Sequence, residues 1–316
     1  MSLSPEQLEE HCTKILKSSR IRNKIVVLCE GEIKKIQGRP SPQSYGRMEE
    51  MPDSNFYQAC VPSRWRQYRP QFFNCGDRKD VIDTYFTLLE LHNQDSGNSY
   101  LAPNKLFAIV DLDLQLKTID NYNFADTESI FQNLYEKFRV KEENLTQHRI
   151  WVTGLIHKEA YFLIPELQSI FDDYSTSAIY NGNSLILEDI YIAMANEISS
   201  DLDLQKNVPK VFNRINCCSG LDCSEIGKLQ DSWKDQFEKA GDENRKDELV
   251  FALLTIKKAK DYWNQIQPPS DWPCSPENFR NFREQLSLEI GRFYSEQSDN
   301  PKYHIPFLLK TLYEFV

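Results

Sequence analysis

The chain has 316 residues, of which 40% are hydrophobic and 12% aromatic, so it is long enough to bury a large core in one or two domains. Its net charge of −10 argues against a protein that coats nucleic acid non-specifically. The charge is uneven, because residues 11–80 carry +7 and residues 81–316 carry −14. Either the basic segment contacts phosphates or it forms a solvated surface of mixed charge.

The N-terminal segment is polar and acidic, unlike a signal peptide, and no apolar run reaches transmembrane length. We therefore expect a cytoplasmic protein whose eight cysteines are reduced, with no membrane partner.

Short apolar runs alternate with helical patterns through the first half of the chain. In chain order we predict a helix over 4–19, strands over 24–30 and 71–75, a helix over 79–92, a strand over 105–111, a helix over 127–139 and a strand over 149–153. Residues 37–70 hold five prolines and predict an irregular insertion. Strands that alternate with helices in this way indicate a parallel sheet.

The second half of the chain shows mostly helical spacing. Helices are predicted over 185–198, 224–240, 246–266, 276–294 and 305–315. We therefore expect an α/β fold with a mainly parallel sheet flanked by helices over residues 1–165, followed by a mainly α-helical region over 166–316.

Two of the predicted strands end in carboxylates. The apolar run of 25–29 ends at Glu30, and that of 106–110 ends at Asp111 and Asp113. We expect the two runs to be neighbouring parallel strands, which would place these acids together at the edge where such sheets bind ligands. Acids so close repel unless a cation or proton neutralises them, and oxygen ligands of this kind suit Mg²⁺ or Mn²⁺. The alternative is a strand followed by an acidic turn.

A further acid, Glu159, follows the fourth predicted strand beside His157 and Lys158. Glu159 is a candidate metal or substrate ligand on the same edge. His157 is either a general base or an ordinary hydrogen-bonding residue.

Cations in two places could hold phosphates. The segment SRWRQYRP interleaves Arg64, Arg66 and Arg69 with aromatic residues, which can grip phosphate and stack bases. In the other interpretation these aromatics pack the insertion onto the body. Arg78 and Lys79 begin a predicted helix, where cations oppose the helix dipole, and this suggests an anionic ligand.

Several enzyme motifs are absent from the sequence. There is no GxxxxGK[ST], no G-x-G-x-x-G after a strand, no G-x-S-x-G and no H-E-x-x-H. Their absence disfavours NTPases, dinucleotide enzymes, serine hydrolases and zinc proteases of those types.

A strand that ends VVLCEGE and a later strand that ends AIVDLD together resemble the Toprim domain, over residues 22–165. Topoisomerases, bacterial primases and the overcoming-lysogenization-defect nucleases share this domain. The resemblance implies that Glu30, Asp111 and Asp113 bind Mg²⁺ and that the glutamate assists proton transfer. HKEAYFL resembles the acidic stretch of the nuclease-like and defence-associated members, which gives Glu159 that role. The long spacing from Glu30 to Asp111 departs from compact Toprim domains, and an insertion would explain it.

Two functions follow from these observations. In the first, the protein is a Mg²⁺- or Mn²⁺-dependent nuclease that cleaves DNA or RNA, with Glu30, Asp111 and Asp113 as catalytic residues. In the second, the Toprim-like core is an inactive scaffold, and the helical half binds a protein partner.

Overall fold

The computed structural model describes residues 2–33, 52–173, 177–269, 272, 275–297 and 299–315. Its centre is a four-stranded, all-parallel sheet with strand order β2-β1-β3-β6. The strands are β1 (Val26–Cys29), β2 (Gln71–Asn74), β3 (Leu106–Val110) and β6 (Ile150–Val152). Helices flank the sheet and a helical region follows it, which confirms the predicted α/β fold.

The two strands that precede the candidate acids lie side by side. β1 pairs with β3 in parallel, with Val26 opposite Leu106 and Cys29 opposite Ile109. Every residue of both strands is buried, as expected for apolar runs covered on both faces. The prediction of neighbouring parallel strands is confirmed, and both strands end at the same edge of the sheet.

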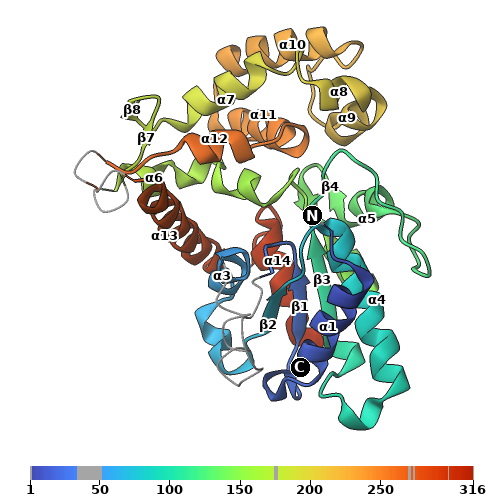
Figure 1. Cartoon of the computed structure of the whole chain (residues 1–316). Coiled ribbons are helices and arrows are strands. Elements are labelled where there is room, and N and C mark those ends of the chain that lie inside the picture. Colours follow the sequence, from blue (N-terminus) through green and yellow to red (C-terminus); the bar gives the residue numbers. More distant parts are fainter. Residues whose placement is uncertain are drawn as a thin grey trace.

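Helices cover both faces of this sheet. α1 (Pro5–Leu16) packs on α4 (Arg78–Gln94), and α4 packs on β1 and β3 (Figure 1). α14 (His304–Thr311) lies behind the sheet, and Phe315 just beyond it stacks near Phe107 of β3. α4 begins where expected, because the Asp77 side chain accepts a hydrogen bond from the first turn.

The region after the sheet is mainly helical, as predicted. Its helices are α6 (Gln168–Asp172), α7 (Leu187–Asn196), α8 (Leu202–Lys206), α9 (Val208–Ile215), α10 (Ile226–Lys239), α11 (Glu243–Ile256), α12 (Lys260–Gln265) and α13 (Pro276–Ser295). Among its described residues the only strands are the short pair β7 (Ile179–Tyr180) and β8 (Asn183–Ser184). The boundary near residue 165 stays a prediction.

The prediction of an irregular insertion over 37–70 is wrong for its second half, which is largely helical. Residues 37–51 lie outside the described part of the chain, but α3 (Pro52–Ala59) and the 3-10 turn η2 (Ser63–Tyr68) follow them. Pro52 suits the first position of a helix, where no backbone N–H is needed. α3 then packs against α13, where Gly291 leaves no room for a side chain beside Ala59.

Two predicted helices are interrupted by other structure. The helix predicted over 127–139 is α5 (Thr127–Leu134), and it is followed by a hairpin of β4 (Tyr135–Glu136) and β5 (Arg139–Val140). The carbonyl of Phe138 bonds to the His304 ring at 2.8 Å, so a distant contact holds the turn. The helix predicted over 246–266 breaks between α11 and α12, where the N–H of Ala259 donates to His157 instead.

Within the described residues, no helix is both long and apolar enough to cross a membrane.

Candidate functional site at the carboxyl edge of the sheet

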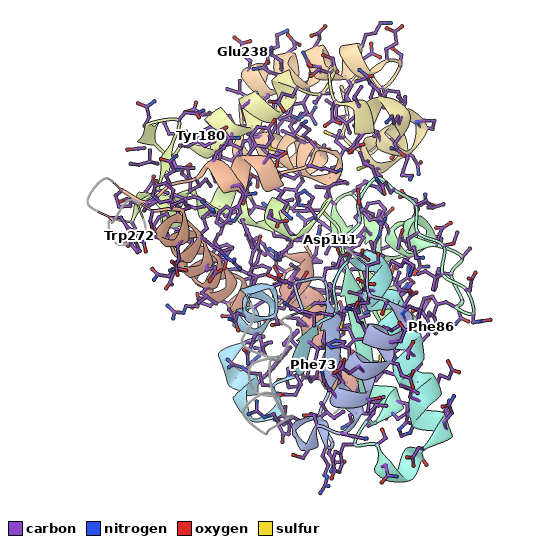
Figure 2. The ribbon with its side chains drawn as sticks, in the orientation of Figure 1. Phe73, Phe86, Asp111, Tyr180, Glu238 and Trp272 are labelled. Carbon is purple, nitrogen blue, oxygen red and sulfur yellow. The ribbon has the colours of Figure 1, made fainter. Side chains whose placement is uncertain are left out.

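A cleft of about 1360 Å³ lies at the carboxyl edge of the sheet. Residues of the sheet region and of the helical region both line it, and Asp111 sits at the junction between the two (Figure 2). The four acids named from the sequence all line this one cleft: Glu30, Asp111, Asp113 and Glu159. Their convergence follows from the strand order, because β1, β3 and β6 are adjacent and parallel.

Glu30 and Asp111 are in direct contact. The backbone N–H of Asp111 donates to Glu30 Oε1 at 2.7 Å, and Asp111 Oδ1 accepts from the N–H of Lys158 at 3.1 Å. Asp113 Oδ1 accepts from the N–H of Leu114 at 2.6 Å. Each carboxylate is thus oriented by one backbone N–H, and no hydrogen bond among the described residues uses its second oxygen.

Burial makes the Glu30 and Asp111 pair costly to ionise. It raises the pKa of Glu30 to about 7, against the opposing effects of the Asp111 N–H and Arg78. It also raises the pKa of Asp111 well above its usual range, and the charges of Glu30 and Glu159 add to that shift. The pair therefore favours a bound proton or a bound cation at neutral pH.

Glu159 behaves in the opposite way. Burial alone would raise its pKa, but the His157 imidazole and the Lys158 ammonium outweigh that effect and lower the pKa to about 2. His157 Nδ1 lies 3.1 Å from Glu159 Oε2, a close contact that lacks the alignment of a hydrogen bond. Because the N–H of Ala259 donates to His157 Nε2, the proton of the neutral ring is assigned to Nδ1, toward Glu159. Glu159 therefore lines the cleft as an ionised carboxylate.

Comparison with protein-family models, with characterised proteins and with solved structures finds no match. The assignment of the site therefore rests on its own geometry.

The acidic residues offer a hard oxygen donor set. Within the described part of the chain, no three His, Cys, Asp or Glu side chains are placed to hold a metal ion together. Mg²⁺ does not require such a cage, since it usually binds one or two carboxylates and takes its remaining ligands from water and phosphate oxygens. Glu30 and Asp111 gain from neutralisation, and their second oxygens accept no hydrogen bond from the described residues, so they fit Mg²⁺ or Mn²⁺ in this open mode.

The sequence-predicted phosphate ligands are mostly elsewhere. Arg78 lines the cleft, but its guanidinium donates to two backbone carbonyls. Lys79 does not line it and pairs with Asp83 at 2.7 Å on the surface of α4. Arg64 and Arg69 do not line it either, and the side chain of Arg66 lies outside the described parts.

The aromatics between those arginines explain their placement. Trp65 is buried, and its ring contacts Tyr313 near the C-terminus, as does the ring of Tyr68. For Trp65 the structure supports the packing interpretation, whereas Tyr68 is 49% exposed.

Three further lysines, to which the sequence analysis assigned no role, line the cleft: Lys158, Lys258 and Lys260. Lys158 forms an ion pair with Asp53 of α3, and burial lowers its pKa. Lys258 and Lys260 enter from the break between α11 and α12, and Lys258 pairs with Asp203 at 2.6 Å. Lys158 lies in the HKEAYFL segment next to Glu159, but no pattern in the sequence marks Lys258 or Lys260, because both reach the cleft through packing between distant elements.

Proposed function

We propose that the protein is a Mg²⁺- or Mn²⁺-dependent nuclease of the Toprim type, which cleaves phosphodiester bonds of DNA or RNA. The observation that carries this proposal is the half-buried pair of Glu30 and Asp111, which are in contact at the ends of two adjacent parallel strands. The pair opens into a cleft large enough for a nucleic-acid strand and lined by cations as well as acids.

The acids have separable roles in such a reaction. Asp111, with Asp113 or Glu30, would hold the metal ion, which supplies charge for activating water and for stabilising the phosphate oxyanion. Glu30, whose carboxylate accepts a hydrogen bond from the N–H of Asp111, would assist proton transfer from the attacking water. Lys260 lines the cleft, is exposed and forms no ion pair among the described residues, so it can contact a substrate phosphate.

A second candidate keeps the core as an inactive scaffold, with the helical half as the binding site for a protein partner. This candidate is favoured because, among the described residues, no three His, Cys, Asp or Glu side chains are placed to bind a metal ion together. Exposed apolar side chains on the helical half also suit it, since Ile186 is 51% and Leu202 is 64% exposed.

The two candidates differ in a direct assay. Labelled single-stranded and duplex DNA and RNA are incubated with the wild type, Asp111→Asn and Asp83→Asn, in Mg²⁺, in Mn²⁺ and in EDTA. Asp83 is a matched control, because it forms only a surface pair with Lys79. The nuclease requires metal-dependent cleavage by the wild type and the control, with a loss of more than about 100-fold in Asp111→Asn. Absence of metal-dependent cleavage by the wild type on every substrate would favour the scaffold.

A further inference from the structure

The loop of residues 111–115 carries Asp111 and Asp113, and its backbone N–H groups form hydrogen bonds with the sheet region. The N–H of Leu112 donates to the Thr153 hydroxyl at 3.0 Å, and the N–H of Asp113 donates to the carbonyl of Ile156 at 2.8 Å. With the bond from the Asp111 N–H to Glu30, these contacts fix one side of the loop.

The carbonyl side of the same loop is held by cations. Four consecutive carbonyls, those of residues 112 to 115, each accept a hydrogen bond from a charged side chain. Arg78 of α4 bridges the first and last, with distances of 3.1 and 2.5 Å. The other two carbonyls receive Arg214, at 2.6 Å, and Lys210. Both of these come from α9 in the helical region, about a hundred residues further along the chain.

Arg214 is built into the interior. Its side chain is 1% exposed, and it pairs with Glu128 of α5 at 2.6 Å. Glu128 balances the buried charge, and the same guanidinium still donates to the carbonyl of Asp113. Hydrogen bonds from charged donors are stronger than neutral ones, so this contact restrains the loop firmly.

The residue held in this way has an unusual backbone. Asp113 has a φ of 40°, in the left-handed region that non-glycine residues rarely adopt. Such a conformation persists only where the surroundings enforce it. The donor from Arg214 acts on the carbonyl of Asp113 itself, and Lys210 acts on the next carbonyl.

We propose that Lys210 and Arg214 are positioning residues, which hold the 111–115 loop so that Asp111 and Asp113 face the cleft. The helical region is then a structural part of the site. The consequence for catalysis rests on the proposed nuclease function, but the restraint on the loop is measurable without it.

The test compares backbone hydrogen exchange in peptides covering the 111–115 loop and β3. The variants are Lys210→Met and Arg214→Gln, with Lys210→Arg as the conservative rescue. Lys239→Met is the matched control, because Lys239 forms an exposed pair within α10 at 2.5 Å. We expect exchange in the loop to rise about tenfold in Lys210→Met and Arg214→Gln, with β3 unchanged. Lys210→Arg and the control should match the wild type.

Unchanged exchange in the loop of Lys210→Met, or an equal rise in β3, would overturn the proposal. If Arg214→Gln does not fold, Lys210→Met decides, because Lys210 is only partly buried. Where the wild type cleaves nucleic acid, the two variants should lower kcat about tenfold or more and leave KM unchanged. A wild type that cleaves nothing would refute the nuclease, whereas the exchange pattern would still decide the role of α9.

Discussion

Glu30→Gln tests whether burial of the site acids shapes the stability of the protein. The amide keeps the shape of the side chain and can still accept the hydrogen bond from the N–H of Asp111. In the wild type, burial raises the pKa of Glu30 from 4.5 to about 7. Between these values the folded protein binds a proton that the unfolded chain has released. The stability linked to this proton is therefore present below pH 4.5 and is lost as the pH rises through 7.

The size of the effect follows from the shift. Moving the pKa of Glu30 from 4.5 to about 7 costs the folded state about 3 kcal/mol once the group is ionised. Dividing this free energy by the unfolding entropy expected for a chain of 316 residues gives a change in melting temperature of about 5 °C. Glu30→Gln avoids the cost, so it should be more stable than the wild type at pH 8 by about that amount.

The assay is thermal unfolding without divalent cations at pH 4.5 and pH 8. Glu136→Gln serves as the control, because Glu136 is exposed in the β4–β5 hairpin. We expect Glu30→Gln and the wild type to melt within about 1 °C of each other at pH 4.5, and Glu30→Gln to melt about 5 °C higher at pH 8. A difference between the two proteins that is the same at both pH values would show that Glu30 titrates normally and refute the reasoning.

Three further predictions concern the metal ion and the packing. At pH 7.5, saturating Mg²⁺ should raise the melting temperature of the wild type by about 4 °C and leave Asp111→Asn unchanged, and equal shifts would exclude a metal at Asp111. A Cβ at Gly291 would lie 2.5 Å from Ala59 Cβ, so urea unfolding of Gly291→Val should show a loss of about 2 kcal/mol, which an unaltered midpoint would contradict. Lys302 forms ion pairs with Glu166 of η7 (Pro165–Leu167) and Asp247 of α11. Lys302→Met should therefore lower the free energy of unfolding by about 3 kcal/mol in the same assay. A loss in Lys302→Met below about 0.5 kcal/mol, typical of a surface pair, would contradict this.

The sequence by itself determined the sheet and the acids at its edge. Apolar runs too continuous for a half-exposed strand predict burial on both faces, and this requires parallel strands with helices between them. Once β1 and β3 are parallel neighbours, Glu30 and Asp111 must lie at the same end, because each directly follows its strand. Local residues also account for helix starts, since the side chains of Asp77 and Ser275 cap the first turns of α4 and α13.

Only the tertiary structure decided how the acids are held and which cations face them. Arg214 and Lys210 donate to carbonyls of the 111–115 loop, although they lie about a hundred residues further along the chain. Lys158 forms an ion pair with Asp53 of α3. Such contacts depend on how helices that are distant in the sequence pack against each other, and the local spacing of residues does not predict that packing. The end of α5 shows the same limit, since its helical pattern continues beyond Leu134. The hydrogen bond of His304 to the Phe138 carbonyl holds a turn there instead, because a distant partner can outweigh the small helix propensity of a few residues.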